Sequence, residues 1–95
     1  MQVNFLNYEC EVKVSKYTDA NTCLRLVSGG MPIATATVIA PIKLPPNHVV
    51  IKDYSENEGI LAALIEARIV KPTGTVCPIG LTICTVCQLT PELLS

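Results

Sequence analysis

Polar and apolar residues alternate along the first half of the chain. ECEVKVSKY (9–17) places its cysteine and valines on one side of an extended chain and its charged residues mostly on the other. TCLRLV (22–27) alternates again, and PIATATVIA (32–40) is rich in β-branched residues. The turn sequences TDAN (18–21) and SGG (28–30) separate these segments. The pattern therefore predicts three strands of an antiparallel meander.

The second half of the chain predicts further strands. PIKLPP (41–46) holds three prolines, so we expect a connection or an edge segment there. HVVIKDY (48–54) contains three consecutive β-branched residues and predicts a fourth strand. TVCPIGLTICTVCQL (75–89) predicts one or two more strands, bent near residues 78–80.

A helix is predicted between the fourth strand and this tail, over about residues 55–68. Ser55 is expected to cap it, and Glu58 to reach back to the backbone amide of Ser55, as in a capping box. Lys71-Pro72 limits its end. The predicted fold is α+β, an antiparallel sheet of four to six strands with one helix packed on one face. The apolar stripe of the helix consists of Ile60, Leu61, Leu64 and Ile65.

Length and composition limit the possible partners. The chain has 95 residues, which predicts a single domain over residues 1–95. It is 49% hydrophobic, which is typical of a folded protein. Seven basic and eight acidic residues give a net charge of −1. This balance provides no electrostatic attraction to phosphate groups, so we expect no direct contact with nucleic acid.

An uncharged segment near the C-terminus raises the question of a membrane span. Residues 72–91 carry no charge and are long enough to cross a bilayer. They contain three prolines, two glycines and five threonines, which favour strands and turns over a spanning helix. The N-terminus lacks the pattern of a signal peptide. We therefore expect a soluble, cytoplasmic protein that does not contact membranes.

Five cysteines are many for a chain of this length. Their odd number favours reduced thiols over a disulfide framework. Cys77, Cys84 and Cys87 have the spacing C-x6-C-x2-C and are candidate zinc ligands. If residues 83–89 form a straight strand, Cys84 and Cys87 face opposite sides and cannot share an ion, whereas a turn would bring them together. The alternative is that the cysteines are small apolar core residues. No other cofactor is expected.

The sequence gives little support to catalysis. It has one histidine, His48, and none of its serines lies in a nucleophile-elbow motif. Glu56 and Glu58 would lie about 200° apart on a helix, so the two carboxylates would not converge on one substrate. We therefore expect that the protein is not an enzyme.

The acidic stretch IKDYSENEG (51–59) allows two interpretations. Its acidic residues can serve mainly to start the predicted helix, because the helix dipole favours negative charge in the first turn. Alternatively, carboxylates beside a tyrosine can contact a groove lined by Arg or Lys on a partner protein. The two interpretations are compatible, because the start of a helix is often exposed. The candidate contact residues are Asp53, Tyr54, Glu56 and Glu58.

Three pieces of the sequence resemble a family of small proteins carried by phages, prophages and plasmids: FLNYECEV, IATATV and IKDYSENEGILAALIEARIV. The resemblance extends from about residue 4 to 72 and returns at VCQL (86–89), and KDYSENEG is its most specific motif. Members of the family have glycine in EAGIV, where this chain has Arg68. The resemblance implies a mobile-element setting and no catalytic residues.

These observations predict a non-enzymatic protein-binding protein of phage or mobile-element origin. Small proteins in that setting often inhibit host defence systems stoichiometrically, as anti-CRISPR proteins do, so the expected partner is a host defence effector such as a CRISPR nuclease. The alternative is a small zinc-stabilised structural or assembly module. A homo-oligomer formed through exposed strand edges is also possible.

Overall fold

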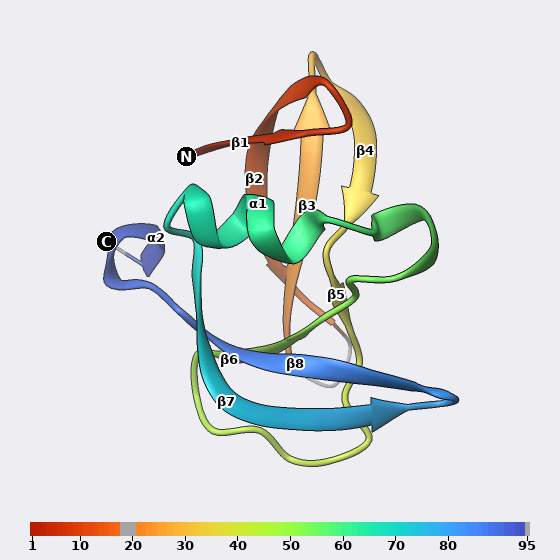
Figure 1. The fold of residues 1–95 in the computed structure, drawn as a ribbon. Helices are drawn as coiled ribbons and strands as arrows, with labels where there is room; N and C mark the ends of the chain where they lie inside the picture. The colour runs from red at the N-terminus through yellow and green to blue at the C-terminus, as the bar shows by residue number, and fades with distance from the viewer. Residues whose placement is uncertain (18–20, 95) are drawn as a thin grey trace.

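The computed structural model describes residues 1–17 and 21–94 and contains two antiparallel sheets (Figure 1). The predicted turn at 18–21 lies mostly outside the described residues. The first sheet consists of β1 (Gln2–Phe5), β2 (Tyr8–Lys16), β3 (Thr22–Ser28) and β4 (Met31–Thr35), in that order. The second sheet consists, in spatial order, of β5 (Thr37–Val38), β6 (His48–Ile51), β8 (Thr82–Leu89) and β7 (Val70–Ile79).

Helical segments form a smaller part of the described chain. They are the 3-10 helix η1 (Ser55–Asn57), the helix α1 (Ile60–Glu66) and the single turn α2 (Pro91–Leu94). With 54% strand and 15% helix, the domain is mostly β. The prediction of a single sheet with one helix packed on it is wrong about the number of sheets, because the strands divide between two sheets. No helix among the described residues is long and apolar enough to span a membrane.

One continuous stretch of chain, residues 31–38, joins the two sheets and is called the bridging strand here. Its first part, β4, pairs with β3, and its last part, β5, pairs with β6. Between them, the backbone N–H of Ala36 donates to the carbonyl of Leu24 at 2.8 Å. The carbonyl of Ala36 accepts a hydrogen bond from the N–H of Lys52, also at 2.8 Å. A single residue thus connects both sheets, because its N–H bonds to β3 and its carbonyl bonds to Lys52, directly after β6.

The main core lies between the two sheets and α1. Figure 1 shows β2 and β3 running across the direction of β7 and β8, as in orthogonally packed sheets whose corner is made by a strand that changes sheet. Side chains from both sheets alternate into this space. The largest fully buried members of the core are Leu24, Leu26, Ile51, Ile60, Leu64 and Ile69.

A second, smaller cluster lies on the far face of the second sheet. Alternation along β6 explains it, because Val49 and Ile51 belong to the main core while Val50 belongs to the second cluster. Leu44, from the proline-rich connection, and Tyr54 pack against this cluster. The buried members of the second cluster are Ala40, Val50, Cys77, Cys84 and Val86.

The helix α1 begins at Ile60, later than predicted, and the capping box is not formed. Ser55 begins η1 with a φ of 57°, and Glu58 follows η1 in a non-helical conformation with a φ of −53° and a ψ of 127°. The ψ of Glu58 and the φ of 93° at Gly59 separate η1 from α1, so residues 55–68 do not form one helix. Neither N-cap residue, Tyr54 for η1 or Gly59 for α1, makes a side-chain capping hydrogen bond.

The C-terminus of α1 ends in a Schellman motif. The N–H of Ile69 donates to the carbonyl of Leu64 at 2.9 Å, and the N–H of Arg68 donates to the carbonyl of Ile65 at 3.0 Å. Ile69 and Leu64 also contact the same main core, which is the apolar contact that usually accompanies this motif. Arg68 occupies the left-handed position with a φ of 60°. The left-handed cap therefore forms although glycine is absent.

We expect Arg68→Gly to stabilise the protein. A left-handed conformation costs an L-residue about 1–2 kcal/mol, and the added backbone freedom of glycine in the unfolded chain offsets part of that gain. The free energy of unfolding should rise by about 0.5–1 kcal/mol, and Tm by about 3–6 °C in thermal unfolding. Arg68→Ala is the matched control and should produce no such rise. A lower Tm for Arg68→Gly than for the wild type would contradict the left-handed conformation of residue 68 in the Schellman motif.

The strand β1 was not predicted from the sequence. It pairs with β2 through a two-residue turn at Leu6 and Asn7, whose φ values are 52° and 63°. Two positive φ angles are typical of a type I′ turn, which usually contains glycine. The turn at Gly29 and Gly30 has the same geometry and was predicted, because its glycines are visible in the sequence.

Candidate binding surfaces

Asp53 follows β6 and caps the start of α1. Its Oδ1 accepts hydrogen bonds from the backbone N–H groups of Gly59 and Leu61, each at 3.0 Å. Such amides have no partner within a helix, and a carboxylate there also complements the helix dipole. Asp53 thus has the capping role that was expected of Ser55 and Glu58. Its hydrogen-bonding oxygen is engaged within the fold rather than directed to a partner protein.

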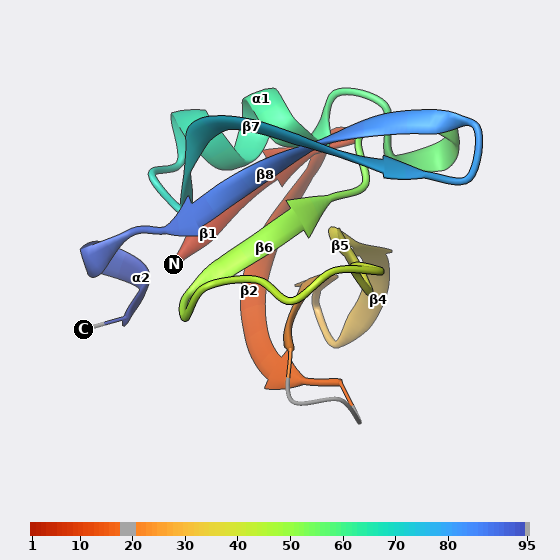
Figure 2. The same ribbon diagram turned by 90° about the horizontal axis from the view of Figure 1, so that it is seen from below.

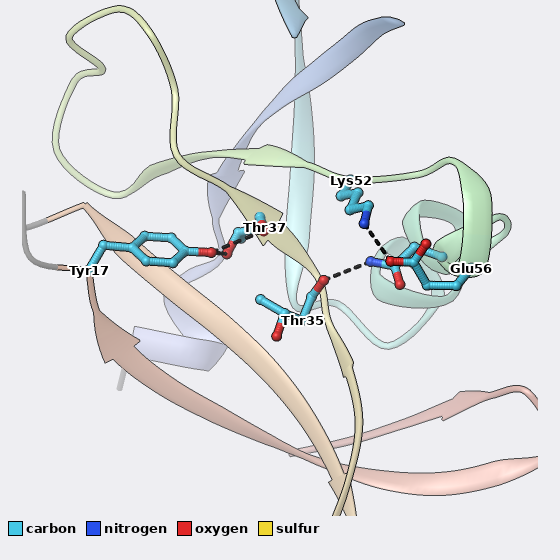
Figure 3. A network of polar contacts seen from close by, with 6 residues as sticks. Tyr17, Thr35, Thr37, Lys52 and Glu56 are labelled. Atoms are coloured by element: carbon cyan, nitrogen blue, oxygen red, sulfur yellow. Dashed lines mark hydrogen bonds and ion pairs between the residues drawn. The ribbon is translucent and has the colours of Figure 1, made fainter. Parts of the chain in front are cut away.

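The other candidate contact residues are also engaged in part. The Lys52 ammonium donates a hydrogen bond to Oε1 of Glu56 (Figure 3). This hydrogen bond is the main reason that the pKa of Glu56 is lowered to about 2. The same ammonium lies 5.4 Å from the ring centroid of Tyr54. Tyr54 packs against the second cluster, and Glu58 is exposed. The acidic stretch therefore presents less free negative charge than its sequence suggests.

Asn57, which was not predicted from the sequence as a functional residue, binds the bridging strand that joins the two sheets. Its side chain is buried, and Nδ2 donates to the carbonyl of Thr35 at 2.7 Å. That carbonyl points away from β3, because alternate residues of an edge strand face outward. Asn57 therefore attaches η1 to the edge of β4. No periodic pattern in the sequence identifies Asn57 as buried, since one amide in an acidic loop looks like any exposed polar residue.

A groove of about 500 Å³ runs beside the bridging strand. Within it, the Tyr17 hydroxyl donates to the carbonyl of Thr37 at 3.0 Å, as Figure 3 shows. Burial raises the pKa of that hydroxyl, so it remains protonated near neutral pH. The lining is mixed, and its two charged side chains, Lys52 and Glu56, bind each other. The groove thus has neither an unpaired charge nor an activated nucleophile among the described residues.

The single histidine is not positioned to activate a thiol. His48 is half-buried at the start of β6, and its Nδ1 lies 2.8 Å from the carbonyl of Pro46. Because a carbonyl can only accept, Nδ1 is the donor in this contact. Within the described residues, no hydrogen bond joins this imidazole to a cysteine. The pair that nucleophilic catalysis by cysteine needs is therefore not present in this conformation.

The structure does not bring the three candidate zinc ligands together. Residues 82–89 form a strand, as one of the two predicted alternatives required. Cys77 and Cys84 face the second cluster, whereas Cys87 faces the main core. Burial raises the pKa of Cys87 to about 11, which keeps it protonated. In the described part of the chain, no three His, Cys, Asp or Glu side chains are grouped closely enough to hold a metal ion.

The β7–β8 hairpin carries a concentration of exposed apolar side chains. Its turn, Gly80-Leu81, has a φ of 59° at the glycine and is the two-residue turn that joins Ile79 to Thr82. Leu81 is fully exposed at 107%, Ile83 is 63% exposed and Val76 is 57% exposed. We name residues 76–85 the hairpin end. Figures 1 and 2 show its turn on the opposite side of the molecule from the C-terminus.

The open edge of the hairpin is poorly suited to pairing with another strand. β7 is the outermost strand of the second sheet, and it contains Pro72 and Pro78, which lack an N–H. Its pairing with β8 shifts between Pro72 and Val76, where Gly74 has a φ of 85°. Prolines and bulges are common devices that protect sheet edges. The exposed faces of the hairpin end, rather than its edge, are therefore the available surface.

Comparisons with protein-family models, with curated proteins and with solved structures found no match to this chain.

Proposed function

We propose that this chain is a non-enzymatic protein-binding protein that docks on a host protein through its hairpin end. The observation that supports this most strongly is the fully exposed Leu81, flanked by the exposed Ile83 and Val76. Exposed apolar side chains that project together from a small domain are typical of interaction sites. A few such side chains can provide most of the energy of binding when they enter a pocket on the partner.

The chemistry of the hairpin end favours an apolar pocket on a protein as its partner. Residues 72–91 carry no charge, so the hairpin end has no cation to attract nucleic acid or anionic lipids. It also lacks tryptophan, tyrosine and phenylalanine, which peripheral membrane proteins commonly insert at the bilayer surface. An apolar pocket requires neither charge nor aromatic rings, because burial of Leu81 alone favours binding.

The class of partner that we propose is a defence effector in the cytoplasm of a bacterial host, such as a CRISPR nuclease. This part of the proposal rests on the resemblance of KDYSENEG and its neighbouring segments to proteins of phages and plasmids. A small binder without catalytic groups can inhibit such an effector stoichiometrically, by covering a surface that the effector needs. The same hairpin end could instead bind a second copy, which would make the chain an assembly module.

The test is an interference assay in bacteria that carry one defence effector and a plasmid that the effector targets. We expect the wild-type chain to restore survival of the plasmid. Leu81→Asp should reduce the affinity for the effector at least about tenfold, because it would bury an unpaired carboxylate at the contact. Its Tm should stay close to that of the wild type, since Leu81 is fully exposed.

Leu94→Asp is the matched control, because Leu94 is an exposed leucine at the end of α2, which Figure 1 shows on the opposite side of the molecule from the hairpin turn. This variant should inhibit as the wild type does. Equal inhibition by Leu81→Asp would contradict docking through the hairpin end. Failure of the wild type against all effectors, with a dimer in light scattering that Leu81→Asp dissociates, would favour the assembly module instead.

A further inference from the structure

Two of the five cysteines are direct neighbours across a pair of strands. Cys77 of β7 and Cys84 of β8 are register partners. Both are buried, both face the second cluster, and both are free thiols. The other cysteines, by contrast, pair in register with valine, serine or proline. Cys77 and Cys84 are therefore the one pair of thiols that the strand register brings together.

The hairpin sets the distance between these two residues. Pro78 has no N–H, so the pair Pro78–Ile83 cannot exchange backbone hydrogen bonds. Hydrogen-bonded and non-hydrogen-bonded pairs alternate along an antiparallel ladder, which makes Cys77–Cys84 a hydrogen-bonded pair. The Cα atoms of such pairs lie about 5.5 Å apart, within the range of about 4.4–6.8 Å that disulfides span. The Cα separation of such a pair therefore allows a bond between the two sulfurs, which also requires the two Cβ atoms to approach to about 3.5–4.5 Å.

We propose that Cys77 and Cys84 form a reversible thiol–disulfide site that reacts with small disulfides such as oxidised glutathione. One cysteine sulfur attacks the glutathione disulfide, releases one glutathione thiol and forms a mixed disulfide. The second cysteine sulfur then attacks the mixed disulfide and releases the second glutathione. The two protein thiols are oxidised by two electrons, and their two protons are carried away on the two glutathione thiols.

The position of the pair gives the reagent a route to these buried sulfurs. The hairpin end extends beyond the main core, as the exposure of Val76 and Ile83 on its other face shows. Segments with few buried contacts open locally more often than a core does. Opening of the hairpin end would expose Cys77 and Cys84 while Cys10 and Cys87 remain in the main core. The expected reaction is therefore selective for one pair.

The experiment is to incubate the folded protein with excess oxidised glutathione, alkylate the remaining thiols and map the peptides by mass spectrometry. The reduced chain contains five cysteines, and we expect three alkylated thiols and one disulfide, Cys77–Cys84, after oxidation. Reduction with dithiothreitol should restore all five free thiols. Closure of the short loop between the cysteines should also raise Tm by about 10 °C.

Two variants keep this result specific. Cys84→Ser should lose the disulfide, whereas Cys23→Ser, in which another buried cysteine is changed, should still form it. The proposal fails if all thiols of the wild type remain after oxidation, or if the disulfide involves Cys10, Cys23 or Cys87. It also fails if the oxidised protein unfolds at a lower temperature than the reduced one, because the bond would then distort the hairpin.

Discussion

Leu64→Ala is expected to lower the free energy of unfolding by about 3 kcal/mol. Leu64 is fully buried where α1 covers the main core, and its carbonyl accepts the hydrogen bond from Ile69 that ends the helix. Truncation removes two methyl groups and a methine group from close contact. The sheets are held by their own hydrogen bonds and cannot collapse fully into the cavity that remains. This loss is a large part of the total stability of a 95-residue domain.

Urea unfolding measures this effect, with Ile65→Ala as the matched control on the same helix. Ile65 is 40% exposed, so its truncation should cost about 1 kcal/mol or less. The structure predicts a clear difference in midpoint between the two variants, at similar slopes. Equal losses at both positions would mean that α1 does not bury Leu64 against the sheets.

Thr37→Val is expected to destabilise the protein by about 2 kcal/mol, although the two side chains have nearly the same shape. The Thr37 Oγ1 accepts a hydrogen bond from the N–H of Leu24 at 3.2 Å and shares a second, at 3.0 Å, with the Tyr17 hydroxyl. Thr37 is buried, so no solvent replaces its hydroxyl. Valine would leave the buried N–H of Leu24 without this acceptor at the joint between the two sheets.

A double-mutant cycle with Tyr17→Phe separates the two hydrogen bonds of Thr37. Tyr17 also donates to the carbonyl of Thr37, which valine preserves. Tyr17→Phe alone should therefore cost about 1 kcal/mol, less than Thr37→Val. The two effects should not add, because both variants remove the same contact between hydroxyl groups. A smaller loss for Thr37→Val than for Tyr17→Phe would contradict the role of Thr37 in holding Leu24.

The positions of most strands followed from the sequence, but the division into two sheets did not. Alternation indicates which side of a strand is buried, and this was sufficient for β2, β3 and β6. PIATATVIA shows no interruption where the chain leaves one sheet for the other, because Ala36 suits both environments. The change from one sheet to the other depends on the hydrogen-bond partners of the Ala36 backbone. These partners, Leu24 and Lys52, lie 12 and 16 residues away in the sequence.

The start of the helix was predicted wrongly for a similar reason. Ser55 and Glu58 have the spacing of a capping box, and Asp53 is equally capable of capping by its chemistry. The sequence cannot distinguish them, because the choice depends on the reversal of the chain at Gly59, with a φ of 93°. The predicted contact residues Asp53 and Glu56 belong to this local architecture.

The cysteines and the hairpin end show which parts of a site can be predicted. Alternation predicted that Cys84 and Cys87 face opposite sides if they lie on a straight strand. Residues 82–89 do form a strand, with Cys84 in the second cluster and Cys87 in the main core. The pairing of Cys77 with Cys84 depends on the turn at Gly80-Leu81, which fixes the register. The exposure of Leu81 could not be predicted from the hydrophobic pattern, since an apolar residue in an apolar segment is ordinarily expected to be buried.

Amide hydrogen exchange, followed residue by residue by NMR, tests the central claim most directly. That claim is that the bridging strand joins both sheets at Ala36 and that Asp53 belongs to the fold. The amides of Ala36 and Lys52 should exchange at least about 1,000-fold more slowly than in an unfolded chain, as those in the middle of both sheets should. The amides of Gly59 and Leu61 should slow measurably and lose this protection in Asp53→Ala. Rapid exchange at Ala36 and Lys52, beside slow exchange within each sheet, would contradict the account.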